Sequence, residues 1–118
     1  MADAPLQPAA FHILLALADG ERHGYALMGD IADLSDGALT IGPGTLYGSI
    51  KRLLADGLIA ESETRRDPEL DDQRRRYYRL TAAGHTVLCA EATRLARLTA
   101  VAAQRKLIRG PAPVFGGA

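Results

Sequence analysis

The fold is decided by the stretch Gly42-Pro43-Gly44-Thr45-Leu46-Tyr47-Gly48-Ser49-Ile50-Lys51-Arg52-Leu53-Leu54-Ala55-Asp56-Gly57. A proline suits the first position of a helix, and a glycine suits the position just after its end, so a helix is predicted over residues 45–56. One face is apolar: Leu46, Ile50, Leu53 and Leu54. The other face is small, polar or cationic: Gly44, Thr45, Gly48, Lys51 and Arg52, with Tyr47 and Ser49 on the flanks.

Two further helices are predicted before this stretch. Residues 6–18 are almost continuously apolar, which favours a buried helix. Residues 24–34 carry Leu27, Ile31 and Leu34 at helical spacing, and Ser35-Asp36-Gly37 follows as a stop. Between the second and third helices, residues 38–41 favour a short extended segment.

A β-hairpin is predicted after the third helix. Residues 58–63 and 76–80 are typical of strands, and the polar segment 64–75 between them is typical of a long hairpin tip. Because side chains alternate along a strand, one of Tyr77 and Tyr78 should enter the core. The expected fold class is therefore mainly α with a small β-hairpin.

A long helix is predicted from residue 82 to about residue 108, with Thr81 as its N-cap. A stripe at spacings of three and four would face water in a monomer, so we expect it to dimerise: Leu88, Ala92, Leu95, Leu98 and Ala102. The alternative is a helix packed along its own domain. The expected organisation is a first domain over residues 1–81, a dimerisation helix over 82–109 and a disordered tail over 110–118.

Length and composition exclude several classes of protein. The chain has 118 residues, and Cys89 is its single cysteine, so no internal disulfide can form. No apolar run approaches the roughly 18 residues of a membrane span, and a cytoplasmic protein is expected. Residues 1–50 contain six carboxylates and one arginine, whereas the remainder contains 13 basic and 8 acidic residues. The basic second half permits an anionic partner.

Three helices followed by a hairpin form the pattern of a winged helix-turn-helix, and here a long helix follows. A helix with a small, polar outer face fits the major groove of DNA, and the hairpin tip suits backbone phosphates. The candidate DNA-binding residues are Tyr25, Gly44, Thr45, Tyr47, Gly48, Ser49, Lys51, Arg52, Arg65, Arg66, Arg74, Arg75 and Arg76.

The chain resembles the PadR-type transcriptional regulators. Four segments carry the resemblance: Leu14-Leu15-Ala16-Leu17 with His23-Gly24-Tyr25-Ala26-Leu27, Gly42-Pro43-Gly44-Thr45-Leu46-Tyr47, Lys51-Arg52-Leu53 through Asp56-Gly57-Leu58-Ile59, and Arg75-Arg76-Tyr77-Tyr78-Arg79-Leu80-Thr81-Ala82-Ala83-Gly84. The resemblance implies a homodimeric repressor of the short subfamily with a single C-terminal dimerisation helix. It implies an operator of double-stranded DNA with two half-sites.

Control by a small molecule or a partner protein is a further expectation. An inducer wedged between the long helices would alter the spacing of the two reading helices. The residues that could line such a pocket are Phe11, Leu14, Leu88, Leu95 and Leu98. Two departures from the family weaken details of this picture. Asp67, Glu69, Asp71 and Asp72 in the hairpin tip oppose phosphate binding, and the absence of tryptophan argues against a site that stacks flat drugs.

Two alternative functions stay open. The acidic first half suits a protein-interaction module that keeps the winged-helix shape without binding DNA. His85 and Cys89 lie four residues apart, as a pair of metal ligands in a metal-sensing regulator would. We expect no bound cofactor or metal, and no enzyme, because three histidines form no recognisable catalytic arrangement.

Overall fold

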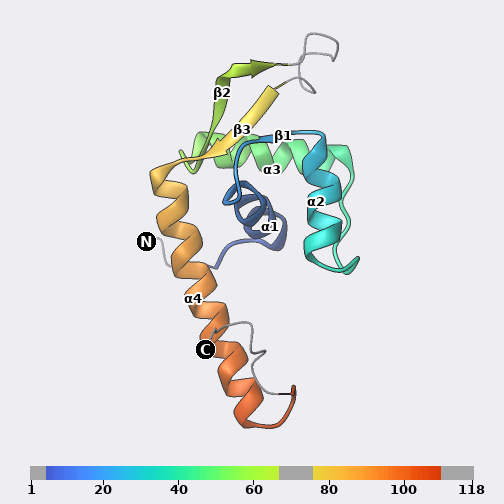
Figure 1. Ribbon diagram of the computed structural model, residues 1–118, viewed down its shortest axis with the longest axis vertical. Helices are drawn as coiled ribbons and strands as arrows, with labels where there is room; N and C mark the ends of the chain where they lie inside the picture. Colours follow the sequence, from blue (N-terminus) through green and yellow to red (C-terminus); the bar gives the residue numbers. More distant parts are fainter. Residues whose placement is uncertain (1–4, 67–75, 110–118) are drawn as a thin grey trace. The chain divides into compact units, whose positions relative to one another are not determined.

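The computed structural model describes residues 5–66 and 76–109. Figure 1 shows the elements, which run in the order α1 (Pro8–Leu17), β1 (Arg22–His23), α2 (Ala26–Leu34), α3 (Pro43–Ala55), β2 (Ile59–Arg66), β3 (Arg76–Leu80) and α4 (Ala82–Gln104). This arrangement confirms the predicted mainly helical fold with a hairpin and a long last helix. The predicted tail over residues 110–118 lies outside the described residues.

The chain separates into two compact units, Met1–Leu88 and Cys89–Ala118, and the division falls within α4. The core of the first unit is built from one face of each helix. Residues from α1, α2 and α3 are almost fully buried: Ile13, Leu14, Leu27, Ile31, Leu46 and Ile50. Tyr78 of β3 and Leu88 of α4 complete this cluster at 2% and 5% exposure. The predicted inward position of one strand tyrosine is therefore confirmed for Tyr78.

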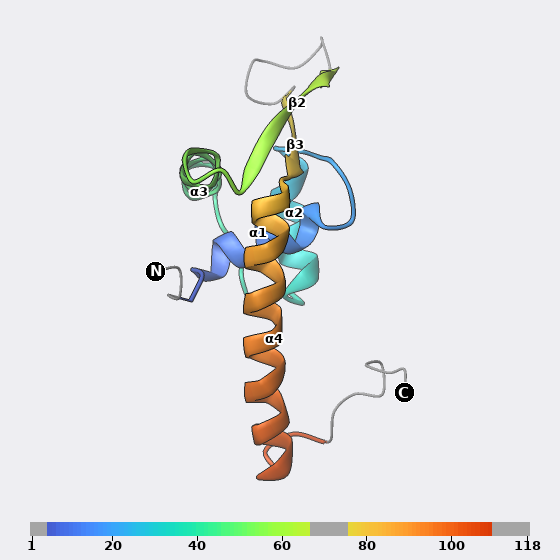
Figure 2. The same cartoon turned by 90° about the vertical axis from the view of Figure 1, so that its left-hand side faces the viewer.

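The sheet has three antiparallel strands in the order β1-β3-β2, one more than the predicted hairpin. β1 consists of two residues, and it pairs Arg22 with Tyr78 and His23 with Tyr77. Such a short strand has no alternating pattern of its own, so only its pairing with β3 identifies it. Figure 2 shows β2 and β3 extending beyond the helices α1, α2 and α3.

Residues 38–41, which the sequence favoured as a short extended segment, form no strand. The side chain of Ser35 takes the place of a strand partner. Its hydroxyl accepts a hydrogen bond from the Leu39 amide at 2.9 Å and lies 3.2 Å from the Leu39 carbonyl oxygen. The turn contains two positive φ angles, 54° at Asp36 and 82° at Gly37. A tight turn closed by the Ser35 side chain therefore precedes Leu39.

α3 and α4 both end at a residue with a positive φ angle, after which the chain bonds back to the last turn of the helix. Gly57 has φ 76°, and Leu58 donates its amide hydrogen to the carbonyl of Leu53 at 3.0 Å, which ends α3 where a glycine stop was predicted. At α4, Lys106 has φ 61°, and Leu107 donates to the carbonyl of Ala102 at 2.9 Å. This helix therefore ends at Gln104 rather than near residue 108.

Candidate nucleic-acid interface

α3 divides cleanly into a buried and an exposed face. Leu46, Ile50 and Leu53 are at most 3% exposed. The exposed face carries five of the residues that the sequence marked for DNA: Gly44, Thr45, Gly48, Lys51 and Arg52. A methyl group added at either Gly44 or Gly48 would meet no atom within 4 Å. This face is therefore open and free of bulk, as the close approach of another backbone requires.

The N-terminus of α3 is prepared for an anion. Gly42 is the N-cap with extended backbone, Pro43 takes the first helical position, and no side chain caps the end. The first turn holds no acidic residue. The first amide groups of a helix have no partner within the helix and carry its partial positive charge. This end of α3 can therefore accept a phosphate oxygen.

Tyr47 lies on the flank of α3 and is half-buried rather than exposed. The reason is Gly24, which ends the short β1 segment. A Cβ atom at Gly24 would lie 3.0 Å from the ring of Tyr78 and 3.4 Å from the ring of Tyr47. The missing side chain at Gly24 therefore lets both rings close over the backbone. Ser49, on the same helix, is also half-buried.

A network of polar side chains joins β2 and β3 beside α3. The Nη1 of Arg76 lies 3.4 Å from Oε2 of Glu61. Burial raises the pKa of the Tyr78 phenol above its ordinary value, and Glu61 raises it further, whereas the positive charge of Arg76 lowers it. The phenol is therefore protonated at neutral pH, and the ion pair with Glu61 places Arg76 at the base of the hairpin.

Lys51 and Arg76 share one hollow between α3 and β3. The hollow has a volume of about 260 Å³ and is also lined by Tyr47, Ile50, Leu54 and Tyr78. Two cations and two phenols in one concavity offer hydrogen-bond donors to an anionic oxygen. The structure thus brings together α3 and the base of the hairpin, two segments that the sequence predicted separately as DNA-binding.

The other candidate residues are less closely joined to α3. Tyr25 is 51% exposed at the N-terminus of α2, and its amide donates to Nδ1 of His23 at 3.3 Å. The imidazole of His23 meets the ring of Tyr77 edge-on at 5.1 Å. Arg74 and Arg75 lie outside the described residues, as do the side chains of Arg65 and Arg66.

Sequence reasoning missed Gly24 and Glu61 as parts of this site. Gly24 stood next to Tyr25 in a quoted motif, but its packing against Tyr47 and Tyr78 joins positions far apart in the chain. Glu61 lies in a predicted strand and pairs with Tyr78 across the sheet. The register of the predicted hairpin would have been needed to place it beside this site.

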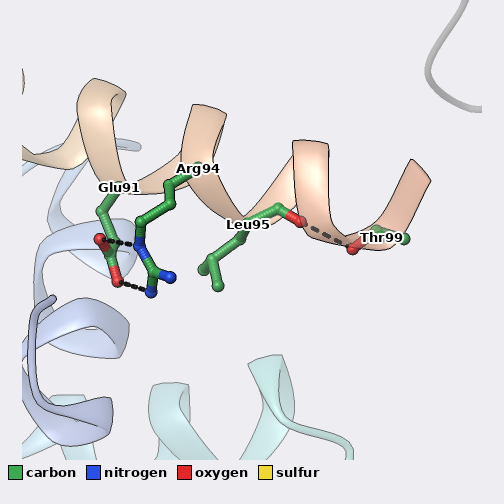
Figure 3. A network of polar contacts seen from close by, with 4 residues as sticks. All are labelled: Glu91, Arg94, Leu95 and Thr99. Atoms are coloured by element: carbon green, nitrogen blue, oxygen red, sulfur yellow. Dashed lines mark hydrogen bonds and ion pairs between the residues drawn. The ribbon is translucent and has the colours of Figure 1, made fainter. Parts of the chain in front are cut away.

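The second unit carries most of the predicted dimerisation residues. Leu98 is 55% exposed, Ala92 is exposed, and Leu95 and Ala102 are half-buried, whereas Leu88 is buried in the first unit. Val101, which was not part of the predicted stripe, is 36% exposed. Figure 3 shows Leu95 on the same side of the helix as the ion pair of Glu91 and Arg94. The Nε and Nη2 of Arg94 donate to the two carboxylate oxygens of Glu91 at 3.0 and 2.8 Å, and these bonds raise the pKa of the Arg94 guanidinium.

Two of the residues expected to line an inducer pocket lie in the core instead. Leu14 is 0% and Leu88 is 5% exposed, so a ligand could reach them only by opening the first unit. Among the described residues, no three His, Cys, Asp or Glu side chains could share a metal ion. No helix within the same residues is long and apolar enough to span a bilayer.

Comparison with known proteins supports this assignment of elements. Residues 13–90 match the family described as "Transcriptional regulator PadR-like family". Over 87 residues the chain is 41% identical to the transcriptional regulator Rv3488 of Mycobacterium tuberculosis, an alignment covering 74% of this chain and 75% of that protein. It is also 41% identical over 87 residues to an uncharacterized 37.1 kDa protein in transposon TN4556 of Streptomyces fradiae, of which it spans only 23%.

A solved structure of Bacillus subtilis PadR in complex with operator DNA has the same fold. The TM-score is 0.61 at 21% identity, and the alignment covers 74% of this chain and 46% of that one. At this identity the likeness concerns the fold.

Proposed function

The chain belongs to the PadR-like family of transcriptional regulators, and from that premise we propose that it binds double-stranded operator DNA through the exposed face of α3. Members of this family are regulators rather than enzymes. The observation that carries the proposal is the division of α3, with Leu46, Ile50 and Leu53 buried and Lys51 and Arg52 exposed beside unobstructed glycines. An α-helix with such an outer face fits the major groove.

Each part of the interface has a distinct role in this proposal. Thr45 and the open backbone at Gly44 and Gly48 approach the base edges, while Lys51 and Arg52 contact phosphates. The N-terminus of α3 receives a further phosphate oxygen. Tyr25 and the hairpin arginines, including Arg76, contact the backbone on either side of the groove.

The proposed assembly is a homodimer joined by the second unit. Leu98 and Val101 expose apolar surface on α4, and a second copy of the helix would cover it. Two α3 helices about 34 Å apart would then enter successive major grooves, which gives an operator with two half-sites. In this proposal the protein is a cytoplasmic repressor, and a small molecule or a protein partner releases it from DNA.

The test is a mobility-shift titration with the DNA upstream of the chain's own gene at two or more salt concentrations. Replacing both Lys51 and Arg52 by alanine should weaken binding to any sequence, because these cations would release counterions on contact with phosphates. The slope of log affinity against log salt should fall by about 0.9 for each phosphate contact that is lost.

The matched control removes two exposed cations of the second unit, Arg105 and Arg109, and should keep most of the slope. Equal affinity and slope for the two double variants would overturn the assignment of α3. A wild-type protein that retards no DNA at any salt concentration would favour the alternative of a protein-interaction module.

A further inference from the structure

A second hollow lies on the other flank of α3, between this helix and the segment that begins α1. It has a volume of about 250 Å³. Leu6 and Ala10 line it from the α1 side, and Leu53 lines it from α3. Leu6 and Ala10 pack against the core yet stay half-exposed, so the hollow has an apolar floor that water reaches.

Polar side chains also line this hollow, and on the α1 side the exposed Gln7 is one of them. Arg52, Ser49 and Asp56 line it from α3 and from the position that follows α3. Arg52 is exposed, and within residues 5–66 and 76–109 no ion pair engages its guanidinium. The half-buried hydroxyl of Ser49 likewise makes no hydrogen bond with any described group. Two donors without partners therefore stand above an apolar floor.

From this geometry we infer that the hollow binds a small apolar carboxylate, with the hydrocarbon part against Leu6, Ala10 and Leu53 and the carboxylate on Arg52 and Ser49. Charge selects an anion over a neutral molecule because Arg52 is a fixed cation with a planar set of donors. The carboxylate of Asp56 opposes the ligand and limits its affinity. The site lies entirely within the first unit.

Binding at this site would regulate the function proposed above, on which this step depends. Arg52 cannot give the same donors to the ligand carboxylate and to a DNA phosphate, and the bound anion would repel the phosphate. Ligand and operator therefore compete, and by linkage each lowers the affinity of the other. This control acts directly at the reading helix and needs no change in the spacing of two subunits.

The test uses octanoate as the probe, followed by amide chemical shifts of the full chain. We expect saturable shifts confined to residues 5–10 and 49–58. Acetate lacks the hydrocarbon tail and 1-octanol lacks the charge, so neither should reproduce them at equal concentration. Shifts centred on residues 95–108, or equal shifts with 1-octanol, would overturn the site.

Three variants make the test specific. Arg52→Gln should weaken octanoate binding about tenfold, because a charge-assisted hydrogen bond is lost. Asp56→Asn should strengthen binding, because it removes the opposing charge. Arg79→Gln removes an exposed cation outside the hollow and should leave octanoate binding unchanged. Unchanged binding in both Arg52→Gln and Asp56→Asn would contradict the inference, provided that both variants keep the wild-type circular dichroism.

Octanoate is then added to the mobility-shift assay, where it should release DNA from the wild type. Shifts at the hollow without release of DNA would overturn the regulatory step. The failure of the proposed function itself is recognised separately, because it appears as an absence of DNA binding before any octanoate is added.

Discussion

The hydroxyl of Thr81 donates a hydrogen bond to the carbonyl oxygen of Gly57 at 2.7 Å. The same hydroxyl accepts a hydrogen bond from the amide of Gly84 at 3.0 Å, which makes Thr81 the N-cap of α4 as predicted. The amide of Thr81 also donates to the carbonyl of Leu58 at 3.1 Å. One residue therefore ties the end of α3 to the start of α4.

Replacing Thr81 by alanine removes both hydroxyl bonds and should lower the free energy of unfolding by about 1–2 kcal/mol. Urea denaturation followed by circular dichroism measures the change. Thr81→Ser keeps the hydroxyl and should lose less than half as much. Thr86 offers a matched control, because its hydroxyl bonds only to the Ala82 carbonyl within an exposed turn of α4. A cost for Thr86→Ala as large as that for Thr81→Ala would contradict this account.

Gly84 should not tolerate a side chain. A Cβ atom there would overlap the backbone carbonyl of Leu58, and backbone cannot turn aside as the end of a side chain can. Gly84→Ala should therefore destabilise the first unit by about 1–3 kcal/mol, although alanine favours helix. Gly29 is the control: a Cβ atom there meets nothing within 4 Å, so Gly29→Ala should stabilise by up to about 1 kcal/mol. Thermal melts of the two variants should shift in opposite directions, and a shift of the same sign would refute the clash.

Alkaline pH should destabilise the fold through Tyr78. Its pKa in the folded protein lies above the ordinary value of 10.0, chiefly because the phenol is buried. The neutral form is therefore favoured by the folded state. The stabilisation is complete below pH 10 and is lost as pH rises from there through the folded pKa.

Urea denaturation of wild type and Tyr78→Phe between pH 8 and pH 11 isolates this contribution. The wild type should lose stability more steeply than the variant above about pH 10. Tyr25, which is 51% exposed, gives the control, and Tyr25→Phe should keep the wild-type slope. A difference between wild type and Tyr78→Phe that stays constant across this range would count against the burial argument.

The proposed dimer predicts a strong effect of charge at Leu98, which is 55% exposed on α4. An unpaired carboxylate buried between two helices is costly, so Leu98→Glu should raise the dissociation constant at least about tenfold. Thr93 is exposed on the opposite side of the helix, and Thr93→Glu should not change the assembly. Sedimentation over a range of concentrations measures both, and a wild type that sediments as a monomer throughout would remove the basis of this prediction.

Much of the fold could be predicted because its signals are local. The spacing of Leu46, Ile50 and Leu53 predicts which face of α3 is buried, and Gly57 predicts where the helix ends. Thr81 is recognisable as an N-cap from its own chemistry. The candidate site was predictable to the same degree, since an apolar stripe on one face implies an open polar face on the other.

The rest depended on contacts between distant parts of the chain. The two residues of β1 become a strand only by pairing with β3. The sequence places Tyr47 on the flank of α3, but its ring is half-buried because it packs against Gly24, which has no side chain. The residue pattern within a single segment therefore could not predict the pairing of β1 or the burial of Tyr47.

The amino-acid sequence by itself determined the helices, the N-cap at Thr81, the stop at Gly57 and the two faces of α3, because helix periodicity and capping act over a few neighbouring residues. The tertiary structure alone decided that Lys51 and Arg76 share one hollow and that Arg52 stands over an apolar one. Those hollows form where separate segments of the chain meet. The distance between these segments depends on how their side chains pack, and not on the local preferences of either segment.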